Sequence, residues 1–226
     1  MPHITVLGGT GYAGSAIVAE AASRGHQMVA VARRRPAQDT PPTDADSGSA
    51  PEFVAGDARD ETFLKQLVRR TDVVVVALAA REEMRSRVIE VVQTLVPLAL
   101  ETGARLGVIG GAGSLRVSPE GPRLIDTDQF PDPAKPEAEE MIRVLERLEG
   151  ADASVDWFYV SPAAEFGAHY PTEPTGSYGA DDSGVLPTGG DGGSQLAAED
   201  LARAVVDEIE TPAHHRQRFA VISASR

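Results

Sequence analysis

Glycines at a fixed spacing follow the first apolar run of the chain. Residues 8–14 read Gly-Gly-Thr-Gly-Tyr-Ala-Gly and contain both the G-x-G-x-x-G and the G-x-x-G-x-x-G spacing. Glycine permits a tight turn, lets backbone amides approach a pyrophosphate, and lets a helix pack closely on a strand. A helix that begins in such a turn adds free N-terminal amides and a partial positive charge. The spacing therefore predicts a dinucleotide-binding turn that consists of Gly8, Gly9, Thr10, Gly11, Tyr12, Ala13 and Gly14.

The elements around this turn decide how specific the glycine spacing is. Residues 3–7 predict a buried strand, residues 13–24 a helix that Gly25 ends, and residues 28–32 a second strand. A strand before the glycines and a helix after them are the context in which such a motif binds a dinucleotide. A glycine turn without a ligand remains the alternative. An ATP-binding phosphate loop is excluded because the Lys-Ser/Thr pair is missing.

Three arginines follow the second predicted strand, in the run Arg33-Arg34-Arg35. Sites for NAD usually carry an Asp or Glu about 20 residues after the glycines, where it binds the ribose hydroxyls. Here no carboxylate occurs before Asp39. Arginine pairs well with a phosphate group, so the sequence favours NADP(H) over NAD(H), with Arg33 and Arg34 beside the 2'-phosphate. A solvated basic turn remains the alternative.

Strands and helices alternate through the rest of the chain. Hydrophobic patterns predict strands at 53–55, 72–77, 106–109, 155–160 and 218–222, and helices at 60–70, 82–102, 136–148 and 197–210. Pro97 should kink or divide the helix at 82–102. This alternation predicts an α/β fold with a doubly wound parallel sheet, the Rossmann fold, in a single domain over residues 1–226.

Two segments lack this periodicity. Residues 34–51 are rich in Pro, Asp, Thr and Ser and predict a mobile surface loop. Residues 161–196 are rich in Gly, Pro, Ser and Asp and predict a small C-terminal substrate lobe or lid. Ligands of such sheets bind at the carboxyl ends of the strands. There Gly56, Asp57 and Ala58 would suit the adenine edge of the cofactor, although Asp57 could instead cap its own turn.

Composition limits the partners of the chain. It has 34 acidic and 21 basic residues, for a net charge of -13, which disfavours nucleic acid and anionic lipid. It has no cysteine, and its adjacent His214 and His215 indicate a surface turn, so we predict no metal site. No apolar run approaches the ~18 residues of a membrane span. The N-terminus lacks the features of a signal peptide, so a cytoplasmic location is expected. The oligomeric state is left open.

Several segments together resemble a known family. They are Gly8 to Gly14, Gly56 to Asp60, Val108 to Leu115, Asp156 to Ala163, and Glu199 to Ala202. In these segments the chain is similar to the atypical short-chain dehydrogenases, and more narrowly to the NAD(P)H-binding, NmrA-like group. That group includes flavin and biliverdin reductases and bacterial proteins of the NADH-flavin reductase or epimerase type. The resemblance implies further cofactor contacts at Ala77, Leu78 and Ala79 and, near the nicotinamide, at Ser161, Pro162 and Ala163.

The usual catalytic pair of short-chain dehydrogenases is missing. That pair, Tyr-x-x-x-Lys, protonates a carbonyl oxygen and binds the ribose. The two lysines here are Lys65 and Lys135, and no tyrosine lies four residues before either. Some similar proteins have a tyrosine just before the equivalent of Lys135, where this chain has Ala134. Alcohol dehydrogenase and sugar epimerase chemistry of the usual kind is therefore disfavoured.

Reduction of a conjugated small molecule needs less from the protein. Hydride passes directly to a flavin or quinone, and water can supply protons. Ser114 could donate a hydrogen bond to the acceptor, or only cap a turn; Lys135 could contact ribose or phosphate, or be a solvated charge. We therefore predict an NADP-dependent reductase of a flavin, quinone or similar acceptor. The alternatives are a non-catalytic sensor of the NADPH/NADP ratio and an epimerase with a non-standard acid–base pair.

Overall fold

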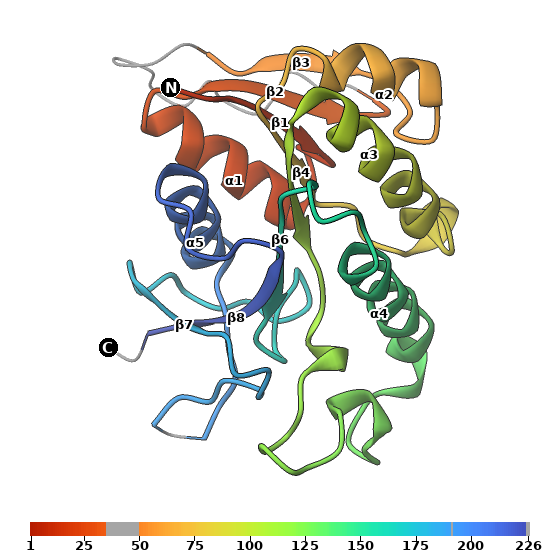
Figure 1. Cartoon of the computed structure of the whole chain (residues 1–226). Helices are drawn as coiled ribbons and strands as arrows, with labels where there is room; N and C mark the ends of the chain where they lie inside the picture. Colours follow the sequence, from red (N-terminus) through yellow and green to blue (C-terminus); the bar gives the residue numbers. More distant parts are fainter. Residues whose placement is uncertain (35–49, 191, 225–226) are drawn as a thin grey trace.

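The computed structural model describes residues 1–34, 50–190 and 192–224 (Figure 1). Most of the predicted loop at 34–51, including Arg35 and Asp39, lies outside these residues. The elements are β1 (His3–Leu7), α1 (Tyr12–Ser23), β2 (Gln27–Ala32), β3 (Glu52–Ala55), α2 (Glu61–Val68), β4 (Val73–Val76), η1 (Glu82–Met84), α3 (Val88–Thr102), β5 (Arg105–Ile109), η2 (Ala112–Ser114), η3 (Leu124–Asp126), η4 (Asp132–Ala134), α4 (Lys135–Glu149), β6 (Trp157–Pro162), β7 (Tyr178–Asp181), α5 (Ala198–Glu210) and β8 (Gln217–Ser223).

One sheet organises the described residues. Its eight strands lie in the order β3-β2-β1-β4-β5-β6-β8-β7, and all neighbours are parallel except β7, which runs antiparallel to β8. The chain moves outward from β1 to β3, then returns to the other side of β1 at β4. This reversal is the topological switch point, outside which ligands of such sheets bind. The predicted doubly wound α/β fold is confirmed.

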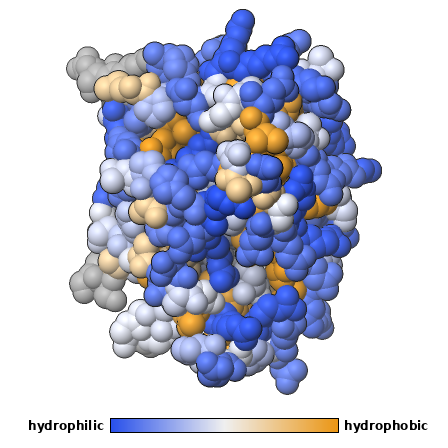
Figure 2. All heavy atoms as spheres, viewed as in Figure 1, coloured by the Kyte–Doolittle hydropathy of each residue, from blue (hydrophilic) through white to orange (hydrophobic). Residues whose placement is uncertain are grey.

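Helices cover both faces of the sheet. In Figure 1, α1 and α5 lie on one side of the strands, and α2, α3 and α4 lie on the other. Each layer forms its own core with the sheet, so the valines of β4 are buried on both faces. On the outer face drawn in Figure 2, hydrophilic residues dominate and hydrophobic ones form small separate groups. The apolar residues are therefore used mainly between the helices and the sheet.

The helix predicted at 82–102 differs from the observed one. The regular helix α3 begins at Val88 and continues through Pro97 to Thr102. Its start is fixed by the buried Glu140 of α4, whose carboxylate accepts from the amides of Val88 at 2.7 Å and Ile89 at 3.2 Å. Long-range capping and packing of the buried stripe, which the sequence pattern does not encode, therefore set where this helix begins and let it include a proline.

Strand β6 lies two residues later than predicted, so Ser161 and Pro162 end the strand instead of following it. Alternate residues of a strand bond to opposite neighbours. Ala163 donates to Val221 of β8 at 2.9 Å, and Val160 accepts from Gly110 beyond β5 at 2.8 Å. Pro162 therefore faces the side on which β5 has already ended, and its missing N–H costs the sheet no hydrogen bond.

The segment 161–196 joins the sheet by contributing β7. Asp200 of α5 is buried and holds this segment in place. Its carboxylate accepts from the amides of Thr175 and Gly176, each at 3.0 Å, and from the Ser223 hydroxyl at 2.7 Å. The predicted substrate lobe is thus tied to α5 and β8 at its base.

The histidine pair lies at the amino ends of β6 and β8. His215 is exposed, as predicted for a surface turn. The expectation is wrong for His214, whose ring stacks on Phe219 at 4.0 Å and whose Nδ1 lies 2.6 Å from the buried Glu208 carboxylate. The neighbouring fold turns His214 inward, which a two-residue pattern cannot reveal. Within the described residues, no three His, Cys, Asp or Glu side chains gather in a way that would hold a metal ion.

Candidate cofactor site

The glycine turn lies at the switch point between β1 and β4. Gly8 has φ +85°, and the amides of Gly8 and Gly9 donate to Val31 of β2 at 2.9 and 3.0 Å. A Cβ on Gly8 would lie 2.4 Å from the Ala77 carbonyl oxygen at the end of β4. The backbone conformation and the close approach of β4 therefore both require glycine at this position.

The other glycines of the motif have different steric surroundings. A Cβ on Gly14 would lie 2.1 Å from the Gly8 carbonyl oxygen, and one on Gly9 would lie 2.8 Å from the Ala30 side chain. These two glycines are required by packing between helix and strand. Gly11 has ordinary extended angles, and a Cβ there would meet a single protein atom, the Gly8 carbonyl oxygen at 3.2 Å. The space beside Gly11 is thus left mostly open by the protein itself.

The N-terminus of α1 is also open. Its N-cap is Gly11, and no side chain caps it. By contrast, the Asp60 side chain caps α2 by accepting from the amides of Thr62 and Phe63. The first-turn amides of a helix have no partners within the helix, and here the residues from Thr10 to Tyr12 are exposed. An uncapped helix N-terminus beside an open glycine is a fit for a pyrophosphate.

The end of β2 carries the arginines that the sequence singled out. Arg33 and Arg34 are exposed, and Arg33 is ion-paired with Glu83 of η1. Asp57, after β3, accepts from the Arg59 amide at 2.9 Å and from the Arg59 guanidinium at 2.6 Å. These hydrogen bonds hold the pKa of Asp57 below its usual range. Asp57 therefore caps its own turn, as one of the two sequence readings expected.

Arg59 is a candidate that our sequence reasoning missed. It is exposed, and its electrostatic partners include Asp57 and the same Glu83 that pairs with Arg33. The guanidinium groups of Arg33 and Arg59 therefore both interact with Glu83. They lie at the end of the sheet where an adenosine ribose would bind. The sequence did carry a signal for Arg59: it lies two residues after Asp57, in the turn that follows strand β3.

The predicted contacts after β4 and β6 differ in exposure. Ala77 and Leu78 are half-buried, and Ala79 is exposed, so this loop presents surface beside the glycine turn. Ser161, Pro162 and Ala163 are all buried, and the exposed surface at the end of β6 begins at the next residue. The end of β4 is therefore accessible beside the glycine turn, whereas the end of β6 is buried.

Comparison with known proteins decides the family. The family described as NAD(P)H-binding matches residues 8–224, nearly the whole chain. The chain belongs to the NAD(P)H-binding family. The predicted resemblance is confirmed at this level, and the cofactor of this NAD(P)H-binding protein is a nicotinamide dinucleotide.

Solved structures similar to this NAD(P)H-binding protein span its full length. A Burkholderia pseudomallei protein that carries the name exported protein is 35% identical, with a TM-score of 0.82 and coverage of 98% of this chain and 100% of that one. A Streptococcus pneumoniae protein named as an NADH-flavin reductase is 28% identical, with a TM-score of 0.84 and coverage of 99% and 100%. A Bacteroides thetaiotaomicron protein named as an epimerase is 27% identical, with a TM-score of 0.82 and coverage of 100% and 98%. The names of the second and third of these proteins divide between reductase and epimerase.

Within the part of the NAD(P)H-binding protein that the structure describes, no helix combines the length and the apolar composition needed to cross a membrane.

An aromatic pair links the glycine turn to the segment after β6. The Tyr12 ring contacts the Phe166 ring edge to face, with centroids 5.4 Å apart. Tyr12 is 38% exposed, and burial raises the pKa of its phenol, with Glu199 adding to this effect. Our sequence reasoning did not find Phe166, because a lone aromatic residue in a loop has no periodic signal. The pair gives this NAD(P)H-binding protein an aromatic surface at the carboxyl edge of the sheet.

Ser114 and Lys135, the two predicted catalytic residues, lie in different surroundings. Ser114 is half-buried in η2, just beyond β5, and its Oγ lies 3.3 Å from Arg218 Nη1. The Lys135 ammonium is ion-paired with Asp132 at 2.7 Å, and this hydrogen bond raises the pKa of Lys135. Lys135 is therefore held in its charged form.

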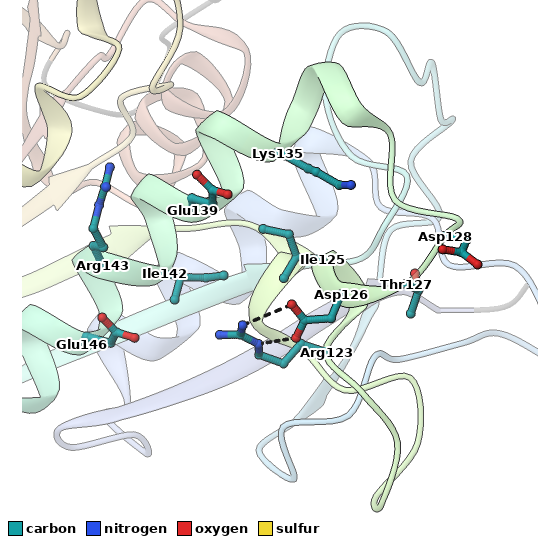
Figure 3. Close-up of a pocket in the computed structure, with 10 residues that line it drawn as sticks. All are labelled: Arg123, Ile125, Asp126, Thr127, Asp128, Lys135, Glu139, Ile142, Arg143 and Glu146. Carbon is teal, nitrogen blue, oxygen red and sulfur yellow. Dashed lines mark hydrogen bonds and ion pairs between the residues drawn. The ribbon is translucent and has the colours of Figure 1, made fainter.

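Lys135 faces a groove of about 620 Å³ on the exposed side of α4 (Figure 3). The walls are charged, and Arg123 pairs there with Asp126 at 2.8 Å. None of the predicted cofactor-binding residues lines this groove. The structure thus brings Ser114 together with Arg218, but it does not bring Lys135 together with the glycine turn.

Proposed function

We propose that this chain is an NADPH-dependent reductase that transfers hydride to a flavin, a quinone or a similar conjugated small molecule. The observation that carries this proposal is that a Tyr-Lys acid pair is missing in three dimensions as well as in sequence. The Lys65 ammonium is ion-paired with Glu61 at 2.6 Å, and Lys135 pairs with Asp132. Both lysines are described, and neither is hydrogen-bonded to a tyrosine.

The tyrosine nearest to the end of β5 also supports this reaction class. Tyr159 is fully buried, and its hydroxyl donates to the Met141 carbonyl at 3.1 Å. Burial raises the pKa of this phenol, and its burial and its bond to a main-chain carbonyl keep it away from the surface where an acceptor would bind. Reduction of a flavin or quinone needs no such acid, because the acceptor can take its proton from water.

In this proposal, different residues bind the cofactor and the acceptor. The amides at the start of α1 bind the pyrophosphate, Arg33 and Arg34 bind the 2'-phosphate, and Tyr12 with Phe166 lies against a flat acceptor. A bound nicotinamide supplies the hydride. Ser114 donates a hydrogen bond to the acceptor, and the buried end of β6 excludes water from beneath the rings. We expect this reductase to act in the cytoplasm, where NADPH is regenerated.

The arginines predict the cofactor preference. Replacing both Arg33→Gln and Arg34→Gln should weaken NADPH binding by about 100-fold or more and change NADH binding by less than about twofold, because each of the two charge-assisted contacts to the 2'-phosphate contributes on the order of 1.5–3 kcal/mol. Nucleotide fluorescence titrations with the purified protein measure both constants. Glu83→Gln, which frees Arg33 from its ion pair, should tighten NADPH binding.

A matched control separates this local effect from general charge. Arg69 follows the last residue of α2 and is also exposed. Its Nη2 lies 3.7 Å from Oε1 of Glu101 in α3. Arg69→Gln removes one positive charge and should leave the ratio of the two constants unchanged. Equal losses of NADPH and NADH binding in the double variant would contradict the assignment of Arg33 and Arg34.

Stopped-flow measurement of NADPH oxidation tests the activity itself. The protein is mixed with NADPH, and then with FMN or a simple benzoquinone, and the loss of NADPH is followed against an enzyme-free control. Rapid oxidation that depends on the protein is the expected result. Tight binding without oxidation by either acceptor would overturn the reductase and favour the sensor. Recycling of cofactor without net oxidation, on an added sugar nucleotide, would favour the epimerase.

A further inference from the structure

Arg218 of β8 occupies an unusual position for an arginine. It is half-buried, and no described carboxylate forms an ion pair with it. Burial lowers the pKa of Arg218, with Tyr159 and Glu149 as the ionisable groups that act against this shift. A partly buried cation without a facing carboxylate costs free energy. A polar or negatively charged ligand that bound beside Arg218 would offset this cost.

The side chain of Arg218 points toward η2. Arg218 is the register partner of Tyr159 on β6, so both side chains lie on the same face of the sheet. Its Nη1 lies 3.3 Å from Ser114 Oγ. A Cβ on Gly184, which has φ +81°, would lie 2.5 Å from its Nη2. The guanidinium is thus held between β8, η2 and the segment that precedes α5.

The chemistry of this contact fixes the direction of the hydrogen bond. Arginine has N–H donors and no acceptor, so Ser114 Oγ must accept from Arg218. The serine hydroxyl then keeps its own hydrogen for another partner. Among the residues that the structure describes, Ser114 Oγ makes no other hydrogen bond. Its O–H is therefore free to donate outward.

A second polar group on the same face also lacks a partner. Ser161 lies two residues after Tyr159 on β6, so its side chain shares the face of Tyr159 and Arg218. It is completely buried, and its Oγ has no hydrogen-bond partner among the described residues. Buried polar atoms are rarely left unsatisfied. An unsatisfied hydroxyl at the carboxyl end of β6 is consistent with a site that a ligand completes.

We propose that Arg218 is a positioning residue for the acceptor, because its guanidinium fixes Ser114 as a hydrogen-bond acceptor and so directs the serine O–H at a carbonyl oxygen of the acceptor. This inference rests on the proposed reductase function. It narrows the substrate class to conjugated carbonyl compounds, whose reduction places negative charge on an oxygen, as in quinones and flavins. The cation behind the serine strengthens its hydrogen bond as that charge develops.

The electrons and protons balance in this step. The acceptor gains a hydride, which is two electrons and a hydrogen nucleus, and the reduced nicotinamide is oxidised to its pyridinium form. The conjugated carbonyl oxygen of the acceptor becomes negative and receives the Ser114 hydrogen bond. Water then supplies one proton to complete the reduced acceptor. Ser114 keeps its proton, so no further acid or base is needed.

A double-mutant cycle on the full chain tests this role. Ser114→Ala should lower kcat for benzoquinone by about 10- to 100-fold, and Arg218→Met by about 10-fold, with the dissociation constant of NADPH unchanged. Because Arg218 acts through Ser114, adding Arg218→Met to Ser114→Ala should cost less than about twofold more. Arg218→Lys, which keeps a donor and a charge, should recover part of the rate.

Controls keep a purely structural role distinguishable. Arg116 lies at the same junction, where its amide donates to Gly184 and its guanidinium to Gly121. Arg116→Met should leave kcat unchanged, and thermal unfolding of every variant is measured alongside. Independent, multiplicative losses from Ser114→Ala and Arg218→Met would overturn the inference, as would an Arg218→Met loss that tracks the unfolding temperature. A wild-type protein that oxidises NADPH with neither FMN nor benzoquinone would overturn the function and the inference together, whereas an active wild type with the wrong variant pattern would overturn the inference alone.

Discussion

Replacing Gly11 with alanine should weaken nucleotide binding by about 100-fold or more and leave the fold intact. The backbone angles at Gly11 suit any residue, and a new methyl group would touch one protein atom at 3.2 Å. On the ligand side, that methyl group would occupy the open space beside the uncapped start of α1. Loss of two charge-assisted hydrogen bonds, each on the order of 1.5–3 kcal/mol, accounts for the expected factor.

Gly14→Ala is the matched variant. We expect it to lower the stability of the fold, whereas Gly11→Ala should lower nucleotide binding and leave the fold intact. Its Cβ would lie 2.1 Å from the Gly8 carbonyl oxygen, which is backbone and cannot move aside cheaply. We expect a loss of about 1–3 kcal/mol in the free energy of unfolding, with any binding loss following from it. Urea unfolding and NADPH fluorescence titration of both variants measure the two effects. A Gly11→Ala protein that binds NADPH as tightly as wild type would place the pyrophosphate elsewhere.

Replacing Arg105 with leucine should lower the free energy of unfolding by about 3–5 kcal/mol. Arg105 is buried at the amino edge of the sheet, opposite the candidate cofactor site. Its guanidinium donates to the Glu208 carboxylate at 2.6 Å and to the carbonyl oxygens of Glu208 and His214, and it lies 4.7 Å from the Phe158 ring centroid. Removal of the cation would leave the Glu208 carboxylate buried with only part of its partners.

The acid dependence of stability provides an independent measure of the same network. Burial alone would raise the pKa of Glu208, but hydrogen bonds from Arg105 and His214 outweigh it and lower the pKa below the ordinary 4.5. A group with a lowered folded-state pKa adds stability above its ordinary pKa and loses that contribution as pH falls toward the folded value. Wild type should therefore lose stability below about pH 4.5, and Arg105→Leu should lose less over the same range.

An exposed ion pair supplies the control for Arg105. Arg87 pairs with Glu90 at 2.7 Å, and both side chains are half exposed. Arg87→Leu should change the free energy of unfolding by less than about 1 kcal/mol, because exposed pairs contribute little. Chemical unfolding of the three proteins at neutral pH and in the acid range measures both effects. A loss in Arg105→Leu no larger than that in Arg87→Leu would show that the buried pair does not stabilise the fold.

The local sequence determined the fold class and the position of the glycine-rich turn. Both rest on short-range patterns: the alternation of apolar segments predicted the parallel sheet, and the spacing from Gly8 to Gly14 predicted the strand-turn-helix that opens it. These signals are reliable because strand and helix periods and glycine's freedom of conformation act within a few residues. Arg33 and Arg34 were predicted as cofactor contacts in the same way, by their distance from the glycines.

Tertiary structure alone decided the contacts that reach across the chain. The sequence could not show that Glu140 fixes the start of α3, that His214 turns inward to Glu208, or that Lys135 faces a groove away from the glycine turn. It also could not pair Ser114 with Arg218, because 104 residues separate them. Such pairs depend on which strands become neighbours and on which face each side chain lies, and these are properties of the assembled sheet.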